Sequence, residues 1–422
     1  MIKKFILPAF LLFSVISFAQ QATSSPYSFY GIGDVKFKGT AENRAMGGLT
    51  IFSDSIHLNF QNPASYSKLK LTTFSLGGTY LTTNLTTSSQ SENARRTAID
   101  YLAVGLPFGK FGVGFGLLPY SSVGYNIQSN TLATTTPVVT PAEIKKYIGS
   151  GGLNKVFAGV GYEFSPKLSF GIDFSYNFGK IETYSLRFAE GIQFGSREKN
   201  LSDIGGATFT VGTTYTTKIS SKLSGFGSLT YSPASILKST NERNIATIQY
   251  SSSGAEIIVD PLDVTVDNTS IKLPSKLAFG FGIGQNRKWM LGTEITFQQS
   301  SDMGNRFNDI NNVKFENAVK YTIGGYYVPN YTSFSKYLEK ITYRAGLRYE
   351  NTGLIINNKS INDFGVTAGL GLPIIGAFSN INIGVEYGKR GTTSANLVQE
   401  NYTNITIGFS LNDKWFQKKR FY

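Results

Sequence analysis

A single histidine, His57, limits the acid–base chemistry that this chain of 422 residues can perform. A catalytic triad would have to be built around it, yet the chain contains no cysteine, and no Gly-x-Ser-x-Gly nucleophile elbow lies nearby. A neutral or charged imidazole can equally well be a hydrogen-bonded structural group. We therefore expect His57 to be structural, and we do not expect the chain to be an enzyme.

Metal and phosphate chemistry are poorly supported as well. With one His and no Cys, and without Asp and Glu residues at ligand spacing, the sequence predicts no metal site. The glycine-rich stretches 149–152 and 369–376 lack the Lys-Ser/Thr pair and the following helix of a phosphate-binding loop. Turns and close strand packing explain these glycines better, so no cofactor is expected.

Three stretches alternate strictly between large apolar residues and small or polar ones: 168–179, 341–350 and 381–388. Successive side chains of a strand point to opposite faces, so each stretch is a strand with one apolar and one polar face. In the second stretch the polar face carries Arg344 and Arg348. Charged side chains facing inward and aromatic ones facing outward are typical of a β-barrel in lipid with a polar lumen.

The N-terminus has the pattern of a secretory signal peptide over residues 1–19. Lys3 and Lys4 precede an apolar run, and Ser-Phe-Ala ends at Ala19, where we expect cleavage. A membrane anchor is the competing interpretation, but the run is short and contains Pro8. Because the chain has no cysteine, lipid acylation and disulfides are excluded.

Composition favours β-structure at a membrane. The chain contains 45 glycines and 14% aromatic residues, and no further run of about 18 apolar residues follows the leader. Its net charge of +13 becomes +11 when Lys3 and Lys4 are removed with the leader. The basic residues are scattered, which speaks against nucleic acid and favours contact with the anionic headgroups of outer-membrane lipid and lipopolysaccharide.

Residues 70–416 contain fourteen strand-like segments, and bacterial barrels have even strand numbers. Short connections such as 109–110 and 165–167 alternate with long ones, namely 129–154, 189–203, 251–271 and 299–316. Short turns belong at the periplasmic rim of a barrel and long loops outside the cell. Residues 417–422 either continue the last strand or form a basic C-terminal tail.

Residues 20–69 do not alternate and are rich in turn residues. A lumen of fourteen strands is too wide for wall side chains to fill, since about eight strands already exhaust them. The segment is therefore predicted to be a plug, or hatch, inside the lumen. A disordered periplasmic tail is the alternative.

These features resemble the FadL/TodX family of outer-membrane transporters for hydrophobic compounds. The resemblance rests on the order of residues in the predicted hatch, where a Gly-x-Gly start at Gly31 precedes a set of motif residues: Arg44, Gly47, Gly48, Asp54, Asn62, Pro63 and Ala64. The ending 411–416 is similar to the Bacteroidota-type branch of this family. The resemblance implies an all-β, fourteen-stranded antiparallel barrel with an N-terminal hatch, integral to the outer membrane of a Gram-negative cell.

The resemblance also implies a function, the passive uptake of small hydrophobic molecules such as long-chain fatty acids or aromatic compounds. The third strand of the family is kinked, and Pro119 in the third predicted strand cannot donate to the sheet ladder, so we expect a gap in the wall there. A ligand would leave sideways through it. The candidate residues of the ligand path are Phe52, Leu58, Phe60, Pro119, Tyr120 and Ser121. For those in the hatch, simple core packing is an equal alternative.

A second hypothesis is a structural or accessory subunit of an outer-membrane secretion or assembly complex, since the Bacteroidota branch includes a type IX secretion subunit. It predicts exposed apolar patches on the loops or on one wall, and a plug without a ligand cavity. The expected partners are therefore membrane lipid and a hydrophobic ligand, or the proteins of such a complex, and not nucleic acid.

Overall fold

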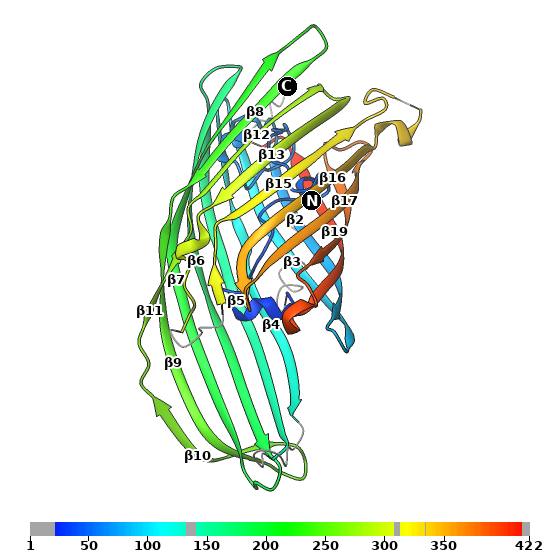
Figure 1. The fold of residues 1–422 in the computed structure, drawn as a ribbon. Coiled ribbons are helices and arrows are strands. Elements are labelled where there is room, and N and C mark those ends of the chain that lie inside the picture. The colour runs from blue at the N-terminus through cyan, green and yellow to red at the C-terminus, as the bar shows by residue number, and fades with distance from the viewer. Residues whose placement is uncertain (1–21, 132–140, 308–312, 334, 416–422) are drawn as a thin grey trace, which may run out of the picture.

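The computed structural model describes residues 22–131, 141–307, 313–333 and 335–415. The expected leader (1–19) and tail (417–422) lie outside these residues. Almost all of the described chain is one antiparallel sheet that closes on itself where β19 (Gln399–Asp413) pairs with β2 (Thr72–Thr86), as Figure 1 shows. The predicted all-β barrel of fourteen antiparallel wall strands is thereby confirmed.

Several of the fourteen wall strands are interrupted. β8 and β9 form one wall strand, β10, β11 and β12 form the next, and the short β14 precedes β15. The bounds of the wall strands after β2 are β3 (Ser91–Phe108), β4 (Phe111–Thr131), β5 (Glu143–Glu163), β6 (Leu168–Ala189), β7 (Gly195–Lys218), β8 (Ser224–Ser232), β9 (Ser235–Tyr250), β10 (Glu256–Val264), β11 (Thr269–Leu273), β12 (Lys276–Gln285), β13 (Trp289–Gln298), β14 (Val313–Phe315), β15 (Ala318–Tyr327), β16 (Thr342–Ile356), β17 (Lys359–Pro373), β18 (Asn380–Arg390) and β19.

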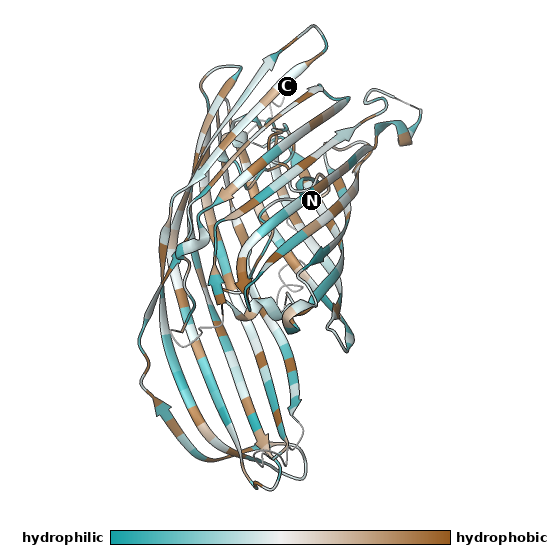
Figure 2. Cartoon of the chain, in the orientation of Figure 1, coloured by the Kyte–Doolittle hydropathy of each residue, from teal (hydrophilic) through white to brown (hydrophobic). Residues whose placement is uncertain are grey.

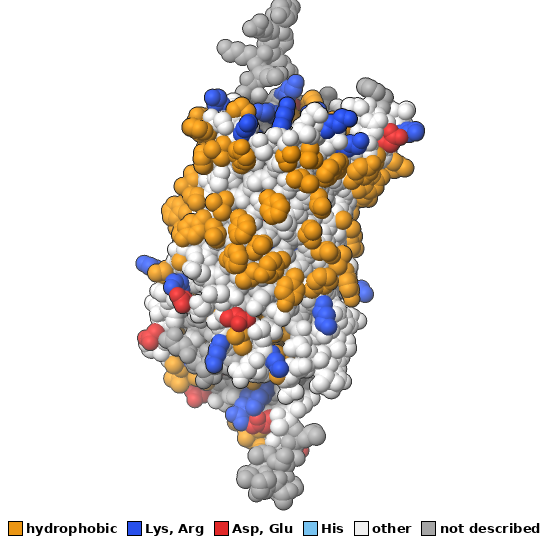
Figure 3. Space-filling view, turned by 45° about the horizontal axis from the view of Figure 1, so that its top comes forward, with side chains coloured by type: hydrophobic (Ala, Val, Ile, Leu, Met, Phe, Trp, Pro, Cys, Tyr) orange, Lys and Arg blue, Asp and Glu red, His pale blue; other side chains and the backbone are white. Residues whose placement is uncertain are grey.

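An apolar band surrounds the outside of the barrel. On β6, Phe170, Phe174 and Phe178 point outward and are exposed, whereas Asp173 and Asn177 between them point inward and are buried. Figure 3 shows this band of apolar side chains, and Figure 2 shows the alternation along the strands. Such a band is the surface that a transmembrane barrel presents to lipid. Within the described residues, no helix is both long and apolar enough to cross a bilayer.

The wall is much taller on one side than on the other. Strands β4 to β7 each have 21 to 24 residues, whereas β13 and β15 have 10. The tall side continues to the lower end of Figure 1, where β10 pairs with β9. The described residues of the expected long loops 129–154, 189–203 and 251–271 are therefore largely strand, which corrects the sequence-based boundaries.

The N-terminal segment 22–71 lies inside the barrel, and it runs between the middle and the upper part of Figure 1. It contains only short elements, namely η1 (Pro26–Phe29), β1 (Asp34–Val35), α2 (Ala41–Arg44) and η2 (Pro63–Lys68). Its apolar side chains are nevertheless buried: Ile32, Leu49, Leu58 and Tyr66 are each at most 1% exposed. The segment is thus held by the wall rather than by its own secondary structure.

Inward-facing glycines of the wall make this contact possible. A Cβ atom on Gly112 would lie 1.8 Å from the carbonyl oxygen of Tyr66, and one on Gly346 would lie 2.3 Å from the carbonyl carbon of Met46. Gly171 is equally close to Pro63. The backbone of the segment therefore packs directly on the backbone of the wall, where any side chain would collide.

Candidate functional site: a charged chamber beside a gap in the wall

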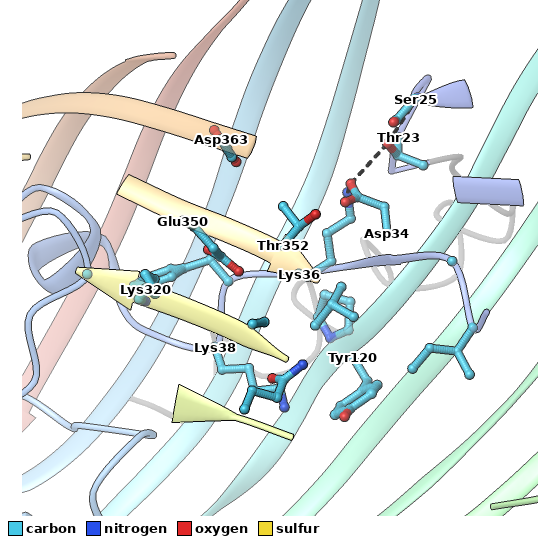
Figure 4. A pocket seen from close by; sticks show the side chains of 18 of the residues that line it. Thr23, Ser25, Asp34, Lys36, Lys38, Tyr120, Lys320, Glu350, Thr352 and Asp363 are labelled. Carbon is cyan, nitrogen blue, oxygen red and sulfur yellow. Dashed lines mark hydrogen bonds and ion pairs between the residues drawn. The ribbon is translucent and has the colours of Figure 1, made fainter. Parts of the chain in front are cut away.

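A cavity of about 390 Å³ lies inside the barrel, between the N-terminal segment and the wall. Figure 4 shows Lys36 of the segment next to Asp34, whereas Lys38 lies over Tyr120 of the wall. Charged and hydroxyl groups make up much of its lining, although some apolar side chains also reach it. We call this cavity the chamber.

One side of the chamber holds a closed network of charges around Arg348 of β16. Its Nε lies 2.7 Å from Glu386 Oε1, and Nη2 lies 3.1 Å from Asp363 Oδ2, while Glu350 is 3.7 Å away. Asn404 donates a further hydrogen bond of 2.9 Å to Glu386. These groups come from four neighbouring strands, and each carboxylate has a cationic partner.

Asp34 in β1 ties the N-terminal segment into this charged side. Its carboxylate is 2.7 Å from Arg390 of β18 and 3.2 Å from Lys36. Burial alone would raise the pKa of Asp34, but the positive charges of Lys36 and Arg390 hold it well below the usual range. The carboxylate is therefore ionised and links the segment to the wall.

The wall has a gap between β3 and β4. These strands pair only from Phe108–Phe111 up to Leu102–Leu117. Beyond that point β2 is the only wall strand that pairs with β3, and β5 is the only wall strand that pairs with β4, with a register shift between Pro119 and Ser121. The break expected at Pro119 from the sequence coincides with the point where the two strands separate. It follows that two strand edges lack a neighbour in the wall.

The N-terminal segment covers the gap from inside. β1 pairs with β4 through Asp34–Ser122 and Val35–Ser121. On the other side of the gap, Arg96 of β3 donates to the carbonyl of Thr23 at 3.3 Å. The segment thus bridges both edges, but it contributes only two residues to the sheet.

The gap begins at the margin of the apolar band. Leu117 of β4 and Val156 of β5 point outward and are 43% and 47% exposed. The next outward residues along the wall are polar, namely Asn154 of β5 and Lys180 of β6. An opening there would lead to the edge of the lipid layer.

The structure separates the candidate ligand-path residues into two groups. Pro119 and Tyr120 line the chamber, as do the hatch-motif residues Arg44, Gly47 and Gly48. Ser121 does not line it, and its hydroxyl donates instead to the carbonyl of Ile32 at 2.7 Å.

The three apolar hatch candidates lie away from the chamber lining. Phe52 packs on Phe226 and Tyr326, with ring centres 5.8 and 5.2 Å apart. Leu58 and Phe60 belong to a buried cluster that also contains Tyr66, Tyr101 and Phe157. Their contacts are those of core packing, the alternative that the sequence left open.

The remaining hatch-motif residues form turns. Asn62 accepts a hydrogen bond from the amide of Ala64 at 3.1 Å and donates to the carbonyl of Thr213 in β7 at 3.1 Å, while Pro63 begins η2. Asp54 lies 2.8 Å from His57 Nδ1. Burial alone would lower the pKa of His57, but Asp54 and Glu42 raise it above its ordinary value. The described residues contain no group of metal-ligating side chains.

Sequence reasoning missed most of the charged lining. Arg348 was visible on the polar face of an alternating stretch, but its partners Asp363 and Glu386 lie on other strands. Asp34 and Lys38 carry no motif. The alternation of the strands could have indicated Asp363 and Glu386 as inward positions, but not Asp34 and Lys38, because the N-terminal segment does not alternate.

Comparisons with known proteins place the chain among relatives. The profile of a family described as BamG matches residues 1–422. The fold is similar to that of the toluene transporter TbuX of Ralstonia pickettii, with 15% identity, a TM-score of 0.60, and coverage of 89% of this chain and 99% of that one. It is also similar to the toluene transporter TodX of Pseudomonas putida, with 17% identity, a TM-score of 0.58, and coverage of 90% and 100%.

A third similar structure is a FadL homologue from Pseudomonas aeruginosa, with 11% identity, a TM-score of 0.56, and coverage of 90% of this chain and 98% of that one. At these identities the likeness concerns the fold. A comparison with curated proteins gave no match.

Proposed function

The chain belongs to the BamG family, and from this premise and the geometry of its lumen we propose that it is an outer-membrane channel for the passive uptake of small hydrophobic molecules. In this proposal a ligand enters the chamber from the side of the long connections and leaves sideways through the gap between β3 and β4. No enzymatic step is involved. The solved relatives described as toluene transporters share the fold, and extending uptake to this chain is part of the proposal.

The proposal rests on a contrast between the tightly packed hatch and the gap, which the segment covers at only a few points. For a ligand to pass along the barrel axis, the segment would have to leave the wall at Gly112, Gly171 and Gly346, where backbone packs on backbone. A lateral path requires the two-residue strand β1 to leave β4 and a few hydrogen bonds around it to break, among them Ser121 to Ile32 and Arg96 to Thr23. Pro119 and Tyr120 lie both on the chamber and at the gap, so they connect the two.

Physical chemistry favours a lateral exit for an apolar molecule. Such a molecule partitions out of water, and a lateral exit delivers it to lipid without returning it to an aqueous phase. Apolar groups on the chamber lining, among them Leu273, Phe315 and Leu354, offer contacts along the way. A fatty-acid-like or aromatic ligand would satisfy both the apolar and the polar parts of this lining.

The test is a disulfide tether that holds β1 on β4 at the gap, made with Val35→Cys combined with Ser121→Cys. These residues are register partners, and the natural chain has no cysteine, so the engineered pair is the only possible disulfide. Uptake of a hydrophobic fluorescent probe into vesicles containing the protein should fall at least tenfold when the pair is oxidised and return on reduction.

Each single-cysteine variant serves as a control, because neither can form the tether within one chain. Equal uptake by the oxidised and reduced double variant, with tether formation verified by mass spectrometry, would exclude exit through this gap.

A second candidate function, an accessory subunit of an outer-membrane assembly or secretion complex, is favoured by the edge strand β10. Ile257, Ile258, Val259 and Leu262 are 48%, 49%, 49% and 61% exposed, and β10 pairs with β9 along only one edge. Exposed apolar edges of this kind can add a strand from another protein.

Chemical cross-linking in native membranes should join β10 to a partner protein, and Ile258→Lys combined with Leu262→Lys should abolish the cross-link. Identical cross-links in wild type and variant would count against it.

A further inference from the structure

Four lysines line the chamber from four separate parts of the fold. Lys38 belongs to the N-terminal segment, Lys155 to β5, Lys276 to β12 and Lys320 to β15. Figure 4 shows Lys38 and Lys320 on the same side of the chamber. Segments this distant in sequence are brought together only by the closed barrel and its plug.

None of the four has a carboxylate within 4.0 Å in the described part of the chain, whereas Lys36 and Arg348 on the same chamber do. Lys38 instead lies over the ring of Tyr120, with its Nζ 4.0 Å from the ring centre. Burial lowers the pKa of Lys38 to about 8. The ammonium groups therefore lack the ionic partners that a half-buried charge usually has.

The carboxylates nearest to these lysines are engaged elsewhere. Glu294 accepts hydrogen bonds from the amide and hydroxyl of Thr50, and Asp173 accepts one from the hydroxyl of Tyr66 at 3.2 Å. Glu350 lies beside Arg348, as described above. These contacts hold Glu294 and Asp173 against the hatch and Glu350 against Arg348. None of the three acids is therefore within ion-pair distance of the four lysines.

The lysines also act on one another. Lys155 feels the charge of Lys38, and Lys276 feels those of Lys38 and Lys320, which places all four in one electrostatic cluster. Asp173 acts on Lys155 with the opposite charge, and Glu294 and Glu350 act on Lys276 in the same way. Because none of these acids forms a direct ion pair with the lysines, the cluster is stabilised further when an anion enters it. The paired network around Arg348 offers no such free positive charge, so an anion is directed to the lysine side.

We propose that Lys38, Lys155, Lys276 and Lys320 form a binding site for a phosphate-bearing ligand. A phosphate monoester carries about −1.5 to −2 charges at pH 7 and three strong acceptor oxygens. It matches a cluster of several ammonium groups better than a carboxylate, which carries one charge. The same chemistry is found in soluble phosphate compounds and in phosphorylated lipid headgroups.

The site can be tested in purified, detergent-solubilised protein, without any transport assay. Titration calorimetry with phenyl phosphate should show saturable binding to the wild type. The combined substitutions Lys276→Gln and Lys320→Gln should weaken this binding at least tenfold. Lys180→Gln is the matched control, because it removes one positive charge from the exposed outer face of β6 and should leave the dissociation constant within twofold of the wild type.

Three comparison ligands identify the class and the source. Inorganic phosphate that competes with phenyl phosphate indicates a soluble ligand, whereas competition only by short-chain phosphatidic acid indicates a lipid headgroup. Tighter binding of decanoate than of either phosphate compound would overturn the assignment to phosphate. Equal binding by the wild type and the double lysine variant, or no saturable binding of any phosphate compound, would overturn the site itself.

The site and the uptake proposal can fail independently. Binding is measured at equilibrium in detergent, whereas uptake is measured in vesicles with the cysteine tether. If the protein binds phenyl phosphate but its uptake of the probe is unchanged by the tether, the phosphate site is present and the lateral route is not.

Discussion

At the scale of the residue, the glycines of the wall determine how closely the N-terminal segment can approach. Gly112 in β4 faces the carbonyl of Tyr66 with no room for a Cβ atom. Other inward glycines, such as Gly161 and Gly324, face the backbone carbonyls of Pro63 and Met46 in the same way. Glycine is usually unfavourable in a strand interior, and here the contact with another backbone offsets that cost.

Gly112→Ala should loosen the segment while the barrel still forms. The new methyl group would lie 1.8 Å from the Tyr66 carbonyl oxygen, so backbone must move. We expect faster hydrogen exchange over residues 55–70, with the gel shift of the folded barrel retained. Gly227→Ala is the control, because its nearest atom would be 3.9 Å away. Unchanged exchange in the Gly112 variant would show that this contact does not hold the segment.

The pair His57 and Asp54 should make the stability of the hatch depend on pH. Burial lowers the pKa of His57 in the folded protein, but Asp54 and Glu42 raise it above its ordinary value. The stability that protonated His57 contributes is therefore complete below about pH 6.5, and it is lost as the pH rises through the higher folded pKa. The pKa of Asp54 is lowered by His57, so its contribution is lost only in acid. The pair therefore supports the hatch best in mildly acidic solution.

Hydrogen exchange of residues 52–62, corrected for intrinsic rates, should rise between pH 6 and pH 9 in the wild type. Asp54→Asn should remove most of this dependence, because the neutral amide no longer raises the pKa of His57. A wild-type profile that is flat over this range would contradict the role of the pair.

At the scale of the element, charged side chains join neighbouring strands on the inner face of the wall. Arg348 links β16 to β17 and β18 through Asp363 and Glu386. It is 17% exposed, and its partners are 14% and 7% exposed, so solvent screens these pairs only in part. The network connects strands that the short turns alone would leave free to shift in register.

Arg348→Met should destabilise the barrel by about 3 kcal/mol, since it leaves two carboxylates without their cation. The temperature at which the folded band is lost on gels should fall accordingly. Glu386→Gln in the same chain should restore part of the loss. Arg187→Gln breaks an exposed pair with Glu143 and should change little. A loss no greater than that of the Arg187 variant would argue that the network is not structural.

At the scale of the whole molecule, the two ends of the barrel differ in length and in charge. The end with short turns carries exposed basic residues, among them Lys110, Lys167, Lys222, Arg287 and Lys288, and Figure 3 shows basic side chains along its upper rim. Basic residues at this rim can contact the phosphates of an anionic leaflet. The tall end bears the long connections, which belong outside the cell.

An epitope inserted between Ser252 and Ser253 should therefore be stained by antibody on intact cells. This position lies in the exposed connection between β9 and β10. An epitope in the connection 219–223 at the opposite end should be stained only after permeabilisation. Folding of both proteins is checked by the gel shift. Staining of the second epitope on intact cells would mean that the barrel has the reverse orientation.

The sequence by itself determined the barrel, because a strand in lipid must alternate and each tight turn interrupts that alternation. Stretches such as 168–179 fix the face of every side chain, and the number of such stretches fixes the strand count. The same reasoning failed at the tall end of the barrel, beyond the apolar band. In β10 and the first residues of β5 and β7 the strands no longer separate lipid from lumen, so the pattern that indicates a strand is absent.

Only the tertiary structure decided what lies next to what in the lumen. Pro119 indicated a broken strand, but that β1 covers the gap depends on pairing between residues about 86 positions apart. The four lysines of the chamber carry no motif and come from four elements, and Arg348 meets its acids across strands. Alternation along a strand tells which side chains point inward, whereas the register between strands and the seating of the plug decide which of them meet.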